Sequence, residues 1–207
     1  ELLLDNVNIK AKEHYGTLNT VMFSPEDLQL IKGEPQLRRR FFDMQIAQTD
    51  KAYYELLVKY NRLLQQRNRL LKEIRDNNGD NGQLNLWNNE LSASAARIIK
   101  KRLAALKELL VIASGIYASI AGGSESMLIN YALKTSNDFI LQQSDKSESE
   151  WQEFYLKEMH ERQALDILRG NTSIGPHRDD LLFYVSGKLL KAFGSQGQQR
   201  SAALALK

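Results

Sequence analysis

The sequence predicts an α+β protein that is predominantly helical: a long antiparallel helical hairpin arm and a third helix, rooted on small β elements. Two long stripes of apolar residues at three- and four-residue spacing predict the hairpin helices. A run of turn-forming residues between the stripes predicts the reversal of the chain. Short β-type segments near both ends of the sequence predict the base of the arm.

The start of the chain, residues 1–33, is expected to form one edge of this base. Residues 2–10 predict two short strands around an Asp5-Asn6 turn, and residues 20–23 predict another strand. Ser24-Pro25-Glu26-Asp27 combines an N-cap residue, a proline at the first helical position and acids that suit the helix dipole. A short helix should therefore follow and end at Gly33.

The predicted arm spans residues 34–170. The second of its two stripes runs from Leu91 to Ile120, and residues 76–82 before it read DNNGDNG. Each stripe needs an apolar partner, and the other stripe is the nearest one, so the two helices should pack against each other. A third helix is predicted over residues 149–169. The first stripe is interrupted only by Arg67 and consists of Leu56, Leu57, Tyr60, Leu63, Leu64, Leu70, Leu71 and Ile74.

The last segment, residues 171–207, predicts a β-hairpin followed by a helix. The hairpin strands would cover residues 181–185 and 189–193 around a Ser186-Gly187 turn, and a further strand is predicted at residues 127–133. Strong helix formers follow Ser195, which predicts that the terminal helix begins there.

Composition narrows the class of protein. The 207 residues are 43% apolar, which suffices for a buried core, and the absence of cysteine rules out disulfides and thiolate metal sites. We expect a cytoplasmic protein without membrane contact, because no apolar run approaches the ~18 residues of a spanning helix. No metal site is expected: Trp87 stands where a calcium loop starting in DNNGDNG needs glutamate, and His14 and His160 lack a suitably spaced partner.

Charge is segregated along the chain although the net charge is only +3. Residues 36–75 carry ten cations against four acids, and residues 97–107 carry five cations and no acid. Such faces are either solvated or in contact with phosphates, and the pattern alone leaves both open. Residues 145–161 carry six acids against two lysines, so this helix would repel DNA and suits a protein partner better.

Two motifs allow a structural and a functional interpretation. Ser195-Gln196-Gly197-Gln198 fits a capping box, but a helix start with free amides and a bare glycine also lets a phosphate approach, with Arg200 one turn further on. The Gly175–Leu181 segment (GPHRDDL) is either a turn leading into a strand or a place where His177 and Arg178 lie near nucleotide or DNA.

Three blocks of sequence carry a resemblance to the bacterial RecF family of recombination mediators, which are ABC-type, SMC-like ATPases. Residues 194–207 resemble the signature motif Leu-Ser-Gly-Gly-Gln, with Gly194 and Gln196 at its first and third positions. Residues 175–181, and residues 23–28 followed by Gly33 and Arg38-Arg39-Arg40, also match in order and approximate spacing. The family's phosphate loop (Walker A) and its Walker B strand are absent from these 207 residues.

The resemblance implies that two subunits together form each nucleotide site. Ser195, Gln196, Gly197, Gln198 and Arg200 would complete, in trans, a site for ATP and magnesium whose phosphate loop belongs to another subunit. ATP would then hold a homodimer together. The parent protein would be a weak DNA-dependent ATPase, whereas this chain alone would not be catalytic.

The resemblance also implies partners. The parent would bind DNA without sequence specificity at gaps and, with RecR and RecO, assist recombinase loading. Alternatives are another SMC-like ATPase head, or a helical adaptor without a nucleotide role in which Ser195 is only a cap. The candidate DNA contacts are Arg38, Arg39, Arg40, Arg62, Arg67, Arg69, Arg97, Lys100, Lys101 and Arg102.

Overall fold

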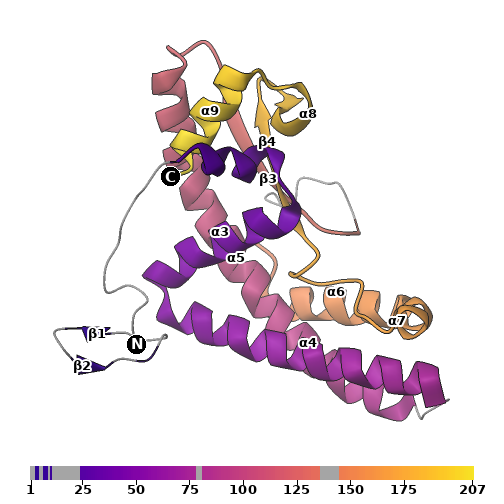
Figure 1. Cartoon of the computed structure of the whole chain (residues 1–207). Coiled ribbons are helices and arrows are strands. Elements are labelled where there is room, and N and C mark those ends of the chain that lie inside the picture. The colour runs from indigo at the N-terminus through magenta and orange to yellow at the C-terminus, as the bar shows by residue number, and fades with distance from the viewer. Residues whose placement is uncertain (1–2, 5–6, 9, 11–23, 78–80, 136–144) are drawn as a thin grey trace.

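A computed structural model describes residues 3–4, 7–8, 10, 24–77, 81–135 and 145–207. The described chain is mostly helical, with a small antiparallel sheet, as the sequence predicts (Figure 1). Its elements in chain order are β1 (Leu3–Leu4), β2 (Val7–Asn8), η1 (Pro25–Leu28), α2 (Gln29–Lys32), α3 (Pro35–Thr49), α4 (Lys51–Asn77), η2 (Asn81–Gln83), α5 (Leu84–Ile120), β3 (Met127–Ala132), α6 (Glu148–Glu161), α7 (Gln163–Arg169), β4 (Asp180–Val185), β5 (Lys188–Leu189), α8 (Leu190–Phe193) and α9 (Gln196–Ala205).

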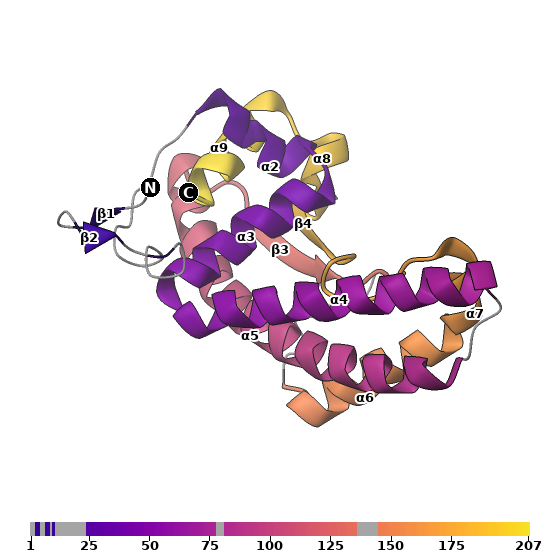
Figure 2. The same ribbon diagram turned by 60° about the horizontal axis from the view of Figure 1, so that its bottom comes forward.

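The predicted helical hairpin is formed by α4 and the first part of α5, which lie side by side (Figure 2). The third arm helix is split: α6 packs against α5, and α7 packs against α4. Leu71, Ile74 and Leu84 form a small apolar cluster toward the tip of the hairpin. Both long helices of the arm are therefore covered by a further helix, α5 by α6 and α4 by α7.

Helix α5 connects the arm to the base. At 1.5 Å per residue its 37 residues extend roughly 55 Å. In the base it packs against β3 and α9. Leu91, Ile98, Leu103, Leu106 and Tyr117 along its length are almost completely buried in one continuous core. The same helix thus forms the interior of both parts.

The base contains an antiparallel sheet with strand order β3-β4-β5. Met127 pairs with Val185 at one end of the β3–β4 ladder, and Ala132 pairs with Asp180 at the other. Alternate residues of β4 are buried, which is the pattern of a strand with one face against a core. The ladder places the start of β4, directly after the Gly175–Leu181 segment, beside the end of β3.

Several predicted elements differ in the structure. The predicted strand over residues 189–193 is wrong, because only Lys188 and Leu189 pair with β4 before the chain enters α8. The helix predicted over residues 149–169 breaks at Arg162. The short strands near the N-terminus pair as β1 and β2, and the strand predicted at residues 20–23 lies outside the described residues.

By length and composition, helix α5 is also apolar enough to cross a membrane, contrary to the prediction that no apolar run is long enough. An 18-residue window in it has a mean hydropathy of 1.6, and 22% of that window is buried. Core helices of globular proteins have the same composition. Helix α5 packs against α4, α6, α9 and β3, but most of this apolar window stays exposed.

Candidate functional site

The start of α9 forms the capping box that the sequence predicts. The Ser195 hydroxyl oxygen accepts a hydrogen bond from the backbone N–H of Gln198 at 3.2 Å. In return, the backbone N–H of Ser195 donates to Gln198 Oε1 at 2.8 Å. The first-turn amides of Gln196 and Gly197 have no acceptor within the helix. They remain able to donate to an external anion.

This helix tip is accessible. Ser195, Gln196, Gly197 and Arg200 are exposed, and Gln198 is half-buried. A Cβ built on Gly197 would meet nothing closer than Ser195 Oγ, at 3.8 Å. The backbone at Gly197 is therefore unobstructed on the side where a side chain would project.

Contacts with α5 and α8 hold the tip in place. Gln198 Nε2 donates to Glu125 Oε1 at 2.6 Å, and the Tyr117 hydroxyl donates to the other oxygen of Glu125 at 2.7 Å. The hydrogen bonds from Tyr117 and then Gln198 hold the pKa of Glu125 below its ordinary value. Gln199 is buried and donates to the Leu190 carbonyl at 3.1 Å. The tip is thus fixed relative to the end of α5.

Gly194, directly before the capping box, lies where a side chain would not fit. A Cβ at this position would lie 2.5 Å from Leu190 Cδ1 and 2.7 Å from the Leu190 carbonyl oxygen. A side chain at residue 194 would therefore push α8 away from α9.

The Gly175–Leu181 segment is locked into the junction of arm and base. The Tyr60 hydroxyl lies 2.6 Å from His177 Nδ1, and His177 Nε2 lies 3.2 Å from the Thr172 carbonyl oxygen. A carbonyl only accepts, so Nε2 carries the proton and Nδ1 accepts from Tyr60. Burial lowers the pKa of His177 to about 3, which fits this neutral tautomer.

A buried polar network lies directly beneath this segment. Arg102 donates to both oxygens of Asp43 at 2.9 Å, to the Tyr131 hydroxyl at 2.8 Å and to the Pro176 carbonyl at 2.7 Å. The Tyr131 hydroxyl donates to Asp179 Oδ2 at 3.0 Å. Burial raises the pKa of Asp179 to about 6, and Arg102 opposes that rise. The network ties α3, α5 and β3 to the loop before β4.

Three of the candidate DNA contacts lie inside the molecule. Arg38 is bidentate to Asp180, with distances of 2.8 and 2.7 Å, and Arg67 donates to Asp166 at 2.8 Å. Arg38, Arg67 and Arg102 are each at most 3% exposed. These arginines stabilise the fold, and the phosphate contact expected for them is wrong because their guanidinium groups do not reach the surface.

The remaining candidates differ in availability. Arg40, Arg62 and Lys100 are exposed and make no hydrogen bond or ion pair with another described residue. Arg39 is half-buried and donates to the Asp179 carbonyl at 2.6 Å. The other three candidates are engaged in ion pairs at the surface: Arg69–Glu73, Arg97–Glu148 and Lys101–Asp50.

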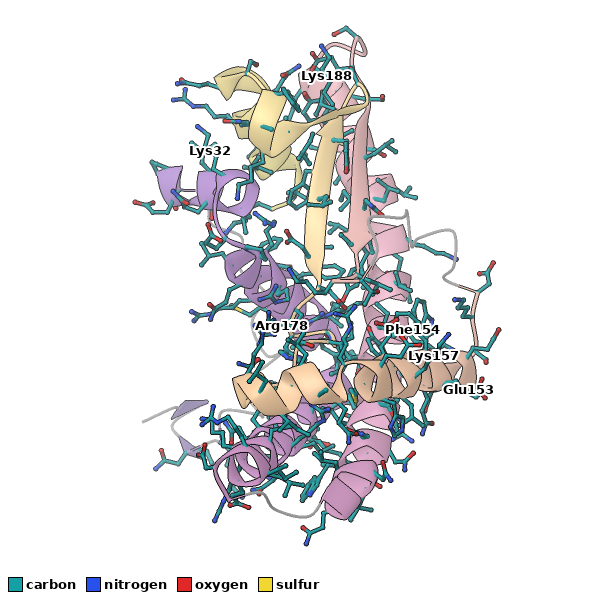
Figure 3. All side chains as sticks on the ribbon, turned by 90° about the vertical axis from the view of Figure 1, so that its right-hand side faces the viewer. Lys32, Glu153, Phe154, Lys157, Arg178 and Lys188 are labelled. Atoms are coloured by element: carbon teal, nitrogen blue, oxygen red, sulfur yellow. The ribbon has the colours of Figure 1, made fainter. Side chains whose placement is uncertain are left out.

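The two predicted motifs are not brought together. Figure 3 places Arg178 at the middle of the molecule, whereas α9 lies at the far end with Lys188. Arg178 is exposed and donates to the Thr172 carbonyl at 3.1 Å. Within the described ranges no three acidic or histidine side chains are grouped as a metal site.

Sequence reasoning missed the residues that position these motifs. Glu125 and Tyr117 hold Gln198, and Asp43, Tyr53 and Tyr131 surround Arg102. The contacts Gln198–Glu125 and Arg102–Asp43 join positions 73 and 59 residues apart, and no local spacing predicts them. One signal was present: Arg67 falls on the apolar stripe of α4, where an outward-facing cation is not expected.

These observations define the class of protein: a helical hairpin arm on a small mixed base, with an accessible, capped helix start at Ser195. No family model matches the sequence. The chain is 40% identical over 191 residues to DNA replication and repair protein RecF of Heliobacterium modesticaldum, covering 92% of this chain and 50% of that protein. It is 42% identical over 201 residues to RecF of Bacillus subtilis, covering 96% and 52%.

Solved structures agree with these sequence comparisons. The recombination mediator RecF with ATPrS, of the RecFOR pathway, matches with a TM-score of 0.88 and 32% identity over 98% of this chain and 53% of that one. RecF with ATP matches with a TM-score of 0.85 and 33% identity over 93% and 50%. The chain is therefore RecF-like along nearly its whole length. It spans about half the length of the RecF proteins it matches.

Proposed function

We propose that this chain is the arm-bearing part of a RecF-type recombination mediator, and that the start of α9 completes in trans an ATP site on another subunit. The observation that carries the proposal is the exposed, capped α9 tip, in which the backbone at Gly197 is unobstructed where a side chain would project. Its support from relatives is the similarity to RecF structures described with ATP and ATPrS.

The tip offers suitable chemistry for a triphosphate. The Ser195 oxygen accepts from Gln198, which leaves the hydroxyl hydrogen free to donate to a phosphate oxygen. The amides of Gln196 and Gly197 point out of the helix start, where the dipole favours anions. Arg200 adds a cation one turn further on. ATP with Mg²⁺ would be held chiefly by the phosphate-loop half, so we expect no hydrolysis by this chain alone.

Substitution of Ser195 separates the capping role from the nucleotide role. The test protein is Bacillus subtilis RecF in which this chain replaces the matched half. Ser195→Asp keeps a good N-cap but places a carboxylate against the phosphates, so the fold should persist while ATP-dependent dimerisation is lost. Ser195→Thr keeps cap and hydroxyl and should dimerise. Light scattering with and without ATP measures the dimer.

Two results would contradict this proposal. If Ser195→Asp dimerises with ATP as well as the unsubstituted chimera does, the α9 tip does not face the nucleotide. If ATP causes no dimerisation even before substitution, the chain acts as a helical adaptor and Ser195 is only a cap.

The second part of the proposal is a DNA contact along the arm. Arg40, Arg62 and Lys100 are the candidates with free guanidinium or ammonium groups. Contacts of this kind go to phosphates, carry no sequence specificity and weaken steeply with salt. Filter binding at several salt concentrations tests this, and a flat salt dependence would remove the DNA contact from the proposal.

The third part is a protein partner on α6. Its acidic residues are largely engaged: Glu148 pairs with Arg97, Glu158 with Arg162, and Glu150 closes a capping box with Ser147. Glu153 is exposed, projects from the edge of α6 in Figure 3, and pairs with no described residue. We propose that RecR, alone or with RecO, docks here in the cytoplasm. Glu153→Lys should abolish co-elution with RecR, and retained co-elution would place the partner elsewhere.

A further inference from the structure

A surface cleft lies where α3, α4, α5 and the loop before β4 meet. Its volume is about 670 Å³, within the range of small-molecule and nucleotide sites. Leu57 contributes apolar surface together with Met44, which is 42% exposed, and half-buried Tyr54. Ala47 and Ile98 also border the cleft but are almost completely buried. The cleft therefore offers an apolar surface with an aromatic ring on one side.

The cleft carries an excess of positive charge. Among its lining residues are three arginines, Arg39, Arg40 and Arg102, and one carboxylate, Asp43. Both oxygens of Asp43 accept from Arg102 at 2.9 Å, and one also accepts from the Tyr53 hydroxyl at 2.6 Å. Asp43 is thus neutralised by Arg102, which leaves Arg39 and Arg40 without a carboxylate at hydrogen-bonding distance.

Several polar side chains of the cleft are available to a ligand. Arg39 donates to a backbone carbonyl, and both burial and the Arg102 cation lower its pKa, so its charge lacks full compensation. Arg40 makes no hydrogen bond or ion pair with the described residues. Nor do the amides of Gln36 and Asn61, which are exposed on α3 and α4. An anion would bind to the arginines while the amides could bond to a polar ring edge.

We propose that this cleft binds one unpaired deoxynucleotide of a single DNA strand, with its phosphate at Arg39 and Arg40 and its base on Met44, Tyr54 and Leu57. The arginines on the rim of the cleft suit a phosphate. The apolar floor suits a base, and only an unpaired base has its face free to stack there. This inference deepens the proposed DNA contact and rests on it.

A charge reversal inside and outside the cleft tests the inference. Arg40→Glu should weaken binding of a labelled oligothymidylate roughly tenfold, the loss expected for a charge-assisted hydrogen bond. Arg169→Glu makes the same charge change on an exposed α7 arginine that neither lines the cleft nor belongs to the candidate DNA contacts. It should weaken binding no more than about twofold, as a screened charge does. Fluorescence anisotropy on the 207-residue chain measures both.

A second probe tests the base. An abasic oligomer of equal length keeps the phosphates but should bind at least about fivefold more weakly, because stacking is lost. Equal losses for Arg40→Glu and Arg169→Glu, or equal binding of abasic and thymidylate oligomers, would contradict nucleotide binding in the cleft while leaving the DNA contact intact. Binding of free thymidylate but not of the oligomer would also overturn it. Absence of any DNA binding would remove the DNA contact itself.

Discussion

At the scale of single residues, Arg67 shows how one charge is used inside the arm. It is fully buried on α4 and donates to Asn88, Asp166 and Thr172. Asp166 is buried as well, so each ion depends on the other for its solvation. The apolar stripe around Arg67 already indicated an inward position. The sequence could not show the acid, because Asp166 lies 99 positions away.

Removal of this arginine should be strongly destabilising. Arg67→Ala leaves Asp166 as an unpaired buried charge, which costs about 3–5 kcal/mol of the free energy of unfolding. Arg69→Ala is the matched control, because Arg69 pairs with Glu73 on the exposed side of the same helix, and it should cost less than about 1 kcal/mol. Urea denaturation followed by circular dichroism measures both. Similar losses would contradict the assignment of Arg67 as a core residue.

His177 and Asp179 have opposite effects on the pH dependence of stability. The pKa of His177 falls from 6.5 to about 3, so the unfolded chain binds more protons between these values and stability is lost as pH falls through them. The pKa of Asp179 rises from 3.8 to about 6, so its contribution is favourable at low pH and is lost as pH rises through about 6.

The variant His177→Gln isolates the histidine term, because Asp179 is present in both proteins. At about 1.36 kcal/mol per pH unit, the unsubstituted chain should lose up to roughly 2 kcal/mol more than the variant between pH 6.5 and 5. Urea unfolding at pH 7, 6 and 5 measures the difference. His160→Gln, at an exposed histidine of α6, is the control. Parallel pH curves for His177→Gln and the unsubstituted chain would show that His177 is not held neutral.

At the scale of elements, helix periodicity predicted α4 and α5 but not the breaks between helices. Asp50 separates α3 from α4, and its side chain accepts from the Tyr53 amide at 3.2 Å, an N-cap contact that the sequence could have suggested. The break at Arg162 has no capping side chain. It arises because α6 packs on α5 while α7 turns onto α4, a choice made by tertiary contacts.

The residues after β4 illustrate the same limit. Residues 189–193 follow a Ser186-Gly187 turn, which predicts the second strand of a hairpin, yet Leu190 is buried and its carbonyl accepts from Gln199 of α9. The packing of α8 on α9 overrides the local β preference. The capping box at Ser195 was predictable because both of its partners lie within four residues.

One substitution at two glycines should have opposite effects on the elements that contain them. Gly194→Ala forces its Cβ against the Leu190 backbone and should destabilise the α8–α9 junction by about 1–3 kcal/mol. Gly115→Ala, near the C-terminal end of α5, meets nothing within 4 Å and should stabilise the protein by about 0.5–1 kcal/mol. Thermal unfolding of both variants measures the signs. Stabilisation by Gly194→Ala would show that α8 does not pack tightly on residue 194.

At the scale of the whole molecule, α5 runs from the arm into the base, and in the base one of its apolar faces is exposed. Val111 and Ile112 are 74% and 60% exposed, and Ile116 and Ile120 are each 44% exposed. Exposed apolar patches of this kind mark contact surfaces or promote association. The arm end of the same helix is covered by α4 and α6. Helix α5 is therefore covered at its arm end, whereas its apolar side chains near the base stay exposed.

This face should cause the 207-residue chain to self-associate. A second copy can cover Val111 and Ile112, each worth about 1.5–3 kcal/mol when fully buried, so light scattering should show mass rising with concentration. Val111→Gln with Ile112→Gln should suppress the rise without lowering the unfolding temperature, because both side chains are already in water. Leu168→Gln is the control, since Leu168 on α7 is 71% exposed but outside this face. If Leu168→Gln suppresses association equally, exposed apolar residues act without regard to position, and the α5 face is not the contact surface.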